Sequence, residues 1–295
     1  MNFDALYKKT LKYEIEGESK KEIRASGMPF CPIKFLINYR DGIFNDSFPF
    51  RFFTECGNVI HEETQNWTAL ANPDVLFGNW KCPKCKKVVL RKVGPMICPI
   101  CSTSMGYKEV TLNFLDAPMN GHPDGFLLEN ILDMWLLELK STTKTKCLSI
   151  EEPDKSHRLQ STLYTSASRK IFKDIYKLPY NIKGYIIKYI SRDNPYITSQ
   201  DFIKEVKQDT LYDNTCKLVN ILVSSIQENN WLRIYRTRPC KKMKSVYKEC
   251  EFLDFCKSEL NKKTLKTLWK QINKKLKIEL TLKNINLFGG GYVGK

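Results

Sequence analysis

Histidine and long apolar runs are scarce in this chain. It has only three histidines among its 295 residues. No stretch approaches the roughly 18 consecutive apolar residues that a membrane-spanning helix needs. The N-terminal segment, MNFDALYKKTLKYEIEGESKKE, is charged and lacks the apolar core of a secretory signal peptide. We therefore expect an intracellular, cytoplasmic protein with no membrane partner, in a compartment where cysteine thiols stay reduced.

Acidic residues are also in deficit. The 48 Lys and Arg residues outnumber the 32 Asp and Glu residues, which gives a net charge of +16. So large a surplus predicts a polyanionic partner, with nucleic acid first, although a lysine-rich proteome would produce the same balance. The sequence has no internal repeat and no helicase motor motif. Its tail, FGGGYVGK, lacks the spacing of a phosphate-binding loop.

Hydrophobic periodicity predicts a mixed α/β protein with a central sheet flanked by helices. We expect a charged lead helix over residues 1–27 and helices over 50–67, 156–176 and 213–230. Strands are predicted within 109–129, 134–142 and 181–191, the first two joined by a short turn at Glu129–Asp133. The last 60 residues contain cysteines and then a basic helical segment, which is either a solvated face or a contact with the DNA backbone.

Four of the 11 cysteines form two CxxC pairs separated by 12 residues. These pairs are CPKC (Cys82, Cys85) and CPIC (Cys98, Cys101), and each is typical of a tight turn that points two thiolates at one metal ion. The spacing predicts a structural zinc ribbon inserted over residues 78–107; disulfides are the alternative, which a reducing compartment disfavours. Its basic rim, KCPKCKKVVLRK, either contacts a DNA backbone or surrounds a purely stabilising element.

The stretch GHPDGFLLENILDMWLLELKS carries an acid, a second acid and a lysine in apolar surroundings. Glu138 and Lys140 are two apart, so in a strand they share a face while Leu139 points to the core. A short hairpin can bring Asp124 beside Glu138. Two converging carboxylates repel each other unless a cation lies between them, and oxygen ligands favour Mg²⁺ or Mn²⁺. The alternative is an exposed edge strand with an incidental Glu–Lys pair.

Four short motifs resemble those of the PD-(D/E)xK nuclease superfamily. They are PD at Pro123–Asp124, ELK at Glu138–Lys140, GNVIH from Gly57 to His61, and QSTLY from Gln160 to Tyr164. The last two are similar to the GxxxH and QxxxY motifs of the RecB-like branch. The resemblance covers roughly residues 28–190 and implies a restriction-endonuclease-like core that contains the inserted ribbon.

The resemblance also implies roles for these residues. His61, Asp124, Glu138 and the backbone carbonyl of Leu139 would bind Mg²⁺ or Mn²⁺, and Lys140 would position the attacking water. Gln160 and Tyr164 would hold the substrate strand or the lysine.

The implied activity is metal-dependent DNA hydrolysis, chiefly exonucleolytic, in recombination, repair or phage replication, which places the protein in a bacterium or a phage-infected cell. An endonuclease or flap nuclease, and a non-catalytic zinc-ribbon accessory protein that binds DNA, remain alternatives. Helicases and single-strand-binding or annealing proteins are the expected partners besides DNA.

Iron–sulfur members of this branch, which include AddB-type subunits and CRISPR-associated and phage exonucleases, add one cysteine before the histidine motif and three near the C-terminus. Cys31 resembles the first, and CEFLDFC supplies Cys250 and Cys256 at the family's last spacing. Tyr247 occupies the position of the remaining cysteine, so Cys240 is the nearest substitute. The resemblance thus implies a 4Fe–4S cluster held by Cys31, Cys240, Cys250 and Cys256.

These motifs divide the chain into four parts. Residues 1–77 would hold the first cluster cysteine and the histidine motif, 78–107 the ribbon, 108–235 the PD, ExK and QxxxY motifs, and 236–295 the C-terminal cysteines and basic helix. Cys56, Cys147 and Cys216 are interpreted as packing residues. His122 is interpreted as a turn residue, and the role of His157 is left open.

Overall fold

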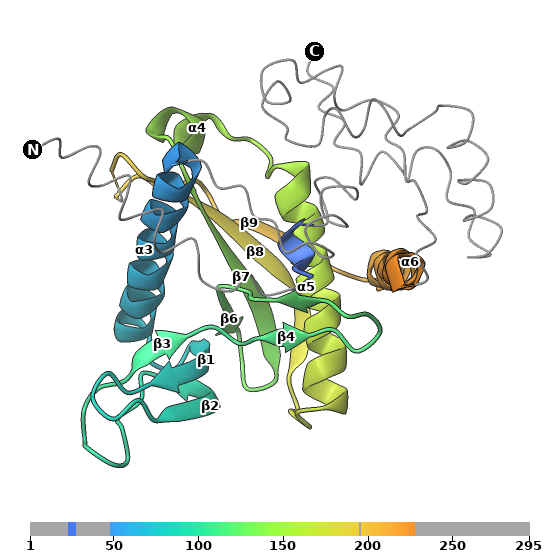
Figure 1. The fold of residues 1–295 in the computed structure, drawn as a ribbon. Helices are drawn as coiled ribbons and strands as arrows, with labels where there is room; N and C mark the ends of the chain where they lie inside the picture. The colour runs from blue at the N-terminus through green and yellow to red at the C-terminus, as the bar shows by residue number, and fades with distance from the viewer. Residues whose placement is uncertain (1–22, 28–47, 195, 228–295) are drawn as a thin grey trace, which may run out of the picture. The chain divides into compact units, whose positions relative to one another are not determined.

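The computed structural model describes residues 23–27, 48–194 and 196–227 (Figure 1). The chain divides into two compact units. The described part of the first unit is residues 48–115 and 120–212, and it contains all the motif residues from His61 to Tyr164. The described part of the second unit is residues 23–27, 116–119 and 213–227.

A central sheet organises the first unit. Its strand order is β2 (Val88–Gly94), β1 (Leu76–Lys81), β6 (Gly125–Leu128), β7 (Asp133–Thr142), β8 (Asn181–Ser191) and β9 (Phe202–Glu205), and β3 (Gly106–Lys108) also pairs with β1. Only the pairing of β7 with β8 is parallel among these strands. The two short strands β4 (Leu112–Asn113) and β5 (Asn120–Gly121) form a separate ladder. The sheet is therefore mixed and mostly antiparallel.

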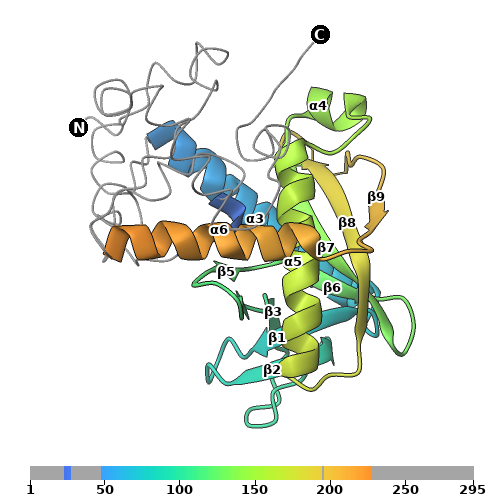
Figure 2. The same cartoon turned by 90° about the vertical axis from the view of Figure 1, so that its right-hand side faces the viewer.

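Helices cover both faces of this sheet. Helix α3 (Phe48–Ala71) packs on the face of β7 that carries Leu137 and Leu139, through Ile60. Helix α5 (Lys155–Asp174) covers the opposite face, where Gln160 reaches Glu138. Figures 1 and 2 show the two helices flanking the central strands. The short helix α4 (Lys144–Ser149) and α5 together form the crossover that a parallel pair of strands requires.

An aromatic core lies between the sheet and α5. Phe77 of β1, Phe126 of β6 and Phe172 of α5 are each almost completely buried, and the ring centroids of Phe126 and Phe172 lie 4.9 Å apart. Rings at such separations pack edge-on or tilted, which favours the contact between their quadrupoles. This core fixes β1 and β6 to α5, and so fixes the strand ends that carry the polar residues described below.

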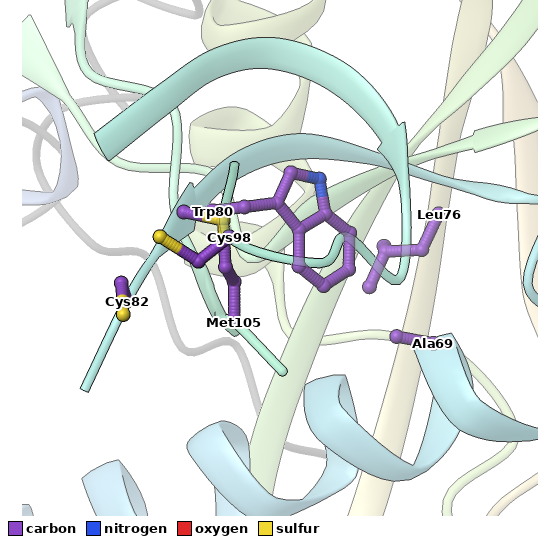
Figure 3. Packing of buried hydrophobic residues seen from close by; sticks show 6 residues of the cluster. All are labelled: Ala69, Leu76, Trp80, Cys82, Cys98 and Met105. Atoms are coloured by element: carbon purple, nitrogen blue, oxygen red, sulfur yellow. The ribbon is translucent and has the colours of Figure 1, made fainter. Parts of the chain in front are cut away.

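The segment that contains the CxxC pairs is continuous with the central sheet. Its first strand, β1, pairs with β2 and β3 but also with β6, through Leu76 opposite Leu127 and Phe77 opposite Phe126. We call residues 76–108 the cysteine ribbon. Its small core contains Trp80, Cys82, Cys98 and Met105, with Leu76 and Ala69 at its base (Figure 3).

The predicted mixed α/β class is confirmed. The predicted helices around residues 50–67, 156–176 and 213–230 correspond to α3, α5 and α6 (Thr210–Gln227). The strands predicted at 134–142 and 181–191 are β7 and β8, whereas residues 109–129 form three short strands rather than one long one. Of the predicted lead helix only residues 23–27 are described, and they contain the short 3-10 helix η1 (Ala25–Gly27).

The described part of the second unit consists of η1, residues 116–119 and most of α6. Within it, the Asn220 side chain donates a hydrogen bond of 2.6 Å to the carbonyl oxygen of Asp116. None of the helices in the described ranges is long and apolar enough to cross a membrane.

Candidate active site and cysteine centre

Strand register places Asp124 beside Glu138. Gly125 of β6 pairs with Leu137 of β7 in an antiparallel register. Asp124, one residue before Gly125, therefore lies beside Glu138, one residue after Leu137. The Asp124 side chain is anchored there by the backbone N–H of Leu139, which donates to Oδ2 at 2.6 Å. Leu139 itself is 1% exposed and points into the core, as strand alternation requires. The turn at Glu129–Asp133 thus brings two acids that are distant in sequence to one place.

Glu138 and Lys140 project from the same face of β7 and form an ion pair. Lys140 Nζ lies 2.5 Å from Glu138 Oε1, and Gln160 of α5 donates to the same oxygen at 2.7 Å. Gln160 Oε1 also accepts from Lys140 at 3.5 Å. Glu138 is 2% exposed, yet its second oxygen, Oε2, has no hydrogen-bond partner within the described residues. A buried carboxylate oxygen without a partner is costly, and a cation would relieve that cost.

Helix α3 contributes two residues one turn apart. His61 Nδ1 lies 3.0 Å from Asp124 Oδ1, and the buried Gln65 donates through Nε2 to the carbonyl oxygen of Asp124 at 2.8 Å. Because residues four apart on a helix share a face, both side chains meet the same loop. The same Gln65 nitrogen also donates to Glu109 Oε1 at 3.1 Å.

Glu109 is a third carboxylate at this place. Its backbone carbonyl accepts from Asn79 Nδ2 at 3.0 Å, so two amide side chains fix its position. Sequence reasoning missed both Glu109 and Gln65. Gln65 lies four residues after His61, and this helical spacing was the available signal for Gln65. Glu109, in contrast, reaches the site only through the pairing of β3 with β1.

The electrostatics of this cluster follow from burial and proximity. Burial raises the pKa of Glu138 to about 7 despite the opposing effect of Lys140. Burial, together with the charge of Asp124, also raises the pKa of Glu109 to about 7. Burial alone would raise the pKa of Asp124, but the His61 ion pair outweighs it and lowers that pKa.

The two basic groups respond in the opposite sense. Burial alone would lower the pKa values of His61 and Lys140, but the neighbouring carboxylates raise both. Asp124 is the main cause for His61, and Glu138 is the main cause for Lys140. Lys140 is therefore an ammonium ion at neutral pH and acts as a hydrogen-bond donor.

Tyr164 and His157 extend this network along α5. Tyr164 is 2% exposed and packs on Gly121, just before Pro123 and Asp124, where a Cβ atom would overlap its ring. It therefore supports the loop that carries Asp124 rather than facing solvent. His157 Nδ1 lies 2.8 Å from the hydroxyl of Tyr189, the β8 residue opposite Lys140. His122 Nδ1 lies 3.4 Å from the hydroxyl oxygen of Thr111.

The four cysteines of the ribbon converge at a second centre. Their sulfur atoms all lie within 4.8 Å of one another, and the pairs Cys82–Cys101 and Cys85–Cys98 are separated by 3.3 and 3.5 Å. The cluster could hold a metal, either a zinc ion or an iron–sulfur centre. Within the described ranges this is the one group of three or more such side chains whose donor atoms are so closely gathered.

Both knuckles of this centre have the same backbone pattern. In the first knuckle the N–H of Cys82 donates to the carbonyl oxygen of Lys87, and the N–H of Lys86 donates to the carbonyl oxygen of Cys82. In the second, the N–H of Cys98 donates to Thr103 O and the N–H of Ser102 donates to Cys98 O. The residue after each pair, Lys86 or Ser102, has positive φ (64° and 51°), which closes the tight turn. Hydrogen bonds from the following backbone amides lower the pKa of Cys82 and, against the opposing effect of burial, that of Cys98. Despite a backbone hydrogen bond at Lys87, burial and the neighbouring thiols raise the pKa of Cys85 to about 11.

No family model and no curated protein matches this chain. Among solved structures, the chain is similar to the crystal structure of SSO0001 at 12% identity and a TM-score of 0.38, over 87% of this chain and 95% of that one.

The donor chemistry of the two centres differs. Carboxylate oxygens and an imidazole at Asp124, Glu138, Glu109 and His61 suit a hard divalent cation, and Glu138 Oε2 is available for one. These donors are engaged with Lys140, Gln65 and one another, and they are not gathered as closely as the cysteines. The predicted iron–sulfur ligands, Cys31, Cys240, Cys250 and Cys256, lie outside the described residues. Cys147 and Cys216 are buried, as expected of packing residues, and Cys56 is half-buried.

Proposed function

We propose that this protein is a metal-dependent deoxyribonuclease with a PD-(D/E)xK active site. The observation that carries the proposal is a cluster of five side chains around a buried carboxylate oxygen that has no hydrogen-bond partner among the described residues. The five are His61 of α3, Asp124 just before β6, Glu138 and Lys140 of β7, and Gln160 of α5. A chance Glu–Lys pair on an edge strand would not explain this, because β7 is a central strand with helices on both faces. The order and register of these groups match the four motifs.

Each side chain has a role that follows from its contacts. Asp124, Glu138 and the Leu139 carbonyl, with His61, would hold a Mg²⁺ or Mn²⁺ ion. The ion would supply Lewis-acid activation of water and offset the charge that develops on the phosphate. The Lys140 ammonium, held between Glu138 and Gln160, would orient the attacking water and donate a hydrogen bond to the phosphate. Gln160 keeps Lys140 and Glu138 in register, and Tyr164 supports the loop of Asp124.

Zinc is the better fit for the cysteine centre. Four thiolates around a single ion, each at the usual Zn–S distance of about 2.3 Å, form a tetrahedron whose edges are about 3.8 Å. The observed separations of 3.3, 3.5 and 3.8 Å match that arrangement. In a 4Fe–4S centre each thiolate binds a different iron, so the sulfurs lie farther apart. The family resemblance implies that a 4Fe–4S cluster would instead be held by Cys31, Cys240, Cys250 and Cys256, which lie outside the described residues. If so, anaerobic purification should give a brown protein that contains iron.

An assay on end-labelled linear and closed-circular DNA tests the proposed activity. With Mg²⁺ or Mn²⁺ we expect degradation of the linear DNA and no cleavage without the cation. Circular DNA left intact would identify an exonuclease, whereas nicked circles would identify an endonuclease. Protein that binds both substrates but cleaves neither, with either cation, would favour the non-catalytic DNA-binding alternative.

A further inference from the structure

The cysteine ribbon carries positive charge without any negative charge. Residues 75–108 contain six lysines, one arginine and no acidic residue. The lysines are Lys81, Lys84, Lys86, Lys87, Lys92 and Lys108, and all six are exposed. Arg91 is half-buried because its guanidinium lies 4.2 Å from the centroid of the Tyr176 ring. The ribbon is therefore a concentrated cationic surface held on a folded hairpin.

Some lysines elsewhere in the described structure are neutralised by acidic partners, whereas the ribbon offers its lysines no acidic residue. Lys146, Lys183 and Lys188 each form an ion pair with a carboxylate at 2.6 to 2.8 Å. None of the six ribbon lysines forms an ion pair with a residue in the described ranges, and the Lys86 ammonium donates to the carbonyl oxygen of Pro83. An uncompensated cluster of like charges weakens the folded state by self-repulsion, and a polyanion would remove that cost.

Strand register places this surface next to the candidate active site. Along β1, Phe77 pairs with Phe126 of β6, whereas Asn79 pairs with Lys108 of β3. Asp124 immediately precedes β6, and Glu109 immediately follows β3. Both acids therefore lie where the pairing partner of β1 changes from β6 to β3. Lys81 is two residues beyond Asn79, a step of about 7 Å along a strand. The knuckles with Lys84 and Lys87 begin immediately after it.

We propose that the cysteine ribbon is a DNA-backbone docking surface that holds the duplex or strand beside the active site. The inference rests on the proposed nuclease function, which supplies DNA as the polyanion. Its lysines are point charges on flexible stems, suited to phosphates rather than to base edges, so the contact carries little sequence preference. Because β1 belongs to the central sheet, the ribbon holds this surface at a fixed position relative to Asp124.

The test is a triple variant in which Lys84, Lys87 and Lys92 are each changed to Gln. Its DNA affinity is measured as a function of salt concentration in the absence of divalent cations. A matched triple variant, Lys173, Lys204 and Lys207 to Gln, removes three exposed lysines from the rest of the first unit. We expect the ribbon variant to bind duplex DNA at least about tenfold more weakly in low salt. The slope of log K against log salt should become shallower by about 2 to 3, since each lost phosphate contact changes it by about 0.9. Turnover at saturating DNA and zinc content should stay unchanged.

The outcomes separate this inference from the nuclease proposal. Equal affinity and slope in the ribbon variant and the matched control would overturn the docking surface while leaving the nuclease proposal intact. A wild-type protein that does not bind DNA would overturn both. If the triple variant loses zinc, the Lys81 and Lys108 to Gln pair outside the knuckles decides the matter: a slope shallower by about 2 supports the docking surface, and an unchanged slope removes it.

Discussion

Lys140 shows how one residue joins two parts of the site. It is paired with Glu138 at 2.5 Å and reaches Gln160 at 3.5 Å, so it is fixed from a strand and from a helix. The neighbouring carboxylates keep its pKa above the ordinary value despite burial. A lysine held in this way is a permanent hydrogen-bond donor rather than a base at neutral pH, which defines the role that the proposed nuclease function assigns to it.

Replacing Lys140 with Ala should lower kcat roughly 10²- to 10³-fold, the usual range for losing one preorganised donor to the charge that develops in the transition state. Cation affinity should not fall, because Lys140 supplies no ligand atom and its ammonium competes with a cation for Glu138. The matched control is Lys188→Ala, which removes a half-buried lysine of the neighbouring strand β8 that is also paired with a carboxylate, that of Asp201. Mn²⁺ titration and single-turnover cleavage measure the two quantities. Near-normal kcat in Lys140→Ala would assign the water-positioning role to another group.

His157 gives a pH dependence that does not involve the cation ligands. Burial, with the charge of Lys140, lowers its pKa from 6.5 to about 4. The folded state therefore disfavours the charged ring, so this contribution to stability is present above pH 6.5 and is lost as pH falls toward 4. Between pH 7 and 4.5 the wild type should lose about 2 to 3 kcal/mol more free energy of unfolding than His157→Gln. Urea unfolding at both pH values checks this, and parallel losses would contradict it.

At the scale of elements, the contact between Gly121 and Tyr164 couples α5 to the loop of Asp124. A Cβ atom at Gly121 would overlap the Tyr164 ring, whereas one at Gly106 would meet only a carbonyl oxygen at 4.0 Å. Gly121→Ala should therefore cost about 1 to 3 kcal/mol and reduce cleavage by displacing the loop. Gly106→Ala should be tolerated. Thermal unfolding and cleavage rates of the two variants test the contact, and equal behaviour would argue against it.

The ribbon is an element whose stability depends on its four thiolates. Cys82→Ser should lower the zinc content from about one ion per chain and reduce Tm by roughly 10 °C or more, because zinc binding and folding are coupled. Cys56→Ser, a half-buried cysteine on α3, should retain zinc and Tm. Elemental analysis and thermal unfolding measure both effects. Full zinc content in Cys82→Ser would exclude that cysteine as a ligand.

Local sequence patterns predicted the helices and strands themselves better than they predicted which strands pair with one another. The positions of Glu138 and Lys140 on one face follow from strand alternation, and Asp124 follows from a short hairpin, so both were accessible from sequence. The pairing of β1 with β6 was not, because the CxxC spacing describes the knuckles but not the strand beneath them. Glu109 was missed for the same reason: its approach to Asp124 depends on which strand replaces β6 along β1.

For the whole molecule, the charge surplus and the placement of the two centres are connected. The net charge of +16 is not spread evenly, since residues 75–108 contribute seven basic and no acidic side chains. Within the first unit these charges lie on the same sheet as Asp124 and Glu138. If the protein is the proposed nuclease, an acidic centre next to a basic surface would let it hold the DNA backbone at the surface and hydrolyse it at the centre.

The most direct test of the central claim is the cleavage rate of Glu138→Gln on linear DNA with saturating Mn²⁺. Gln keeps the size of the side chain but removes the buried charge. The account predicts that DNA binding survives and that cleavage falls below detection, while Glu152→Gln, which changes a largely exposed glutamate, cleaves like the wild type. Cleavage by Glu138→Gln at the wild-type rate would contradict the active-site assignment.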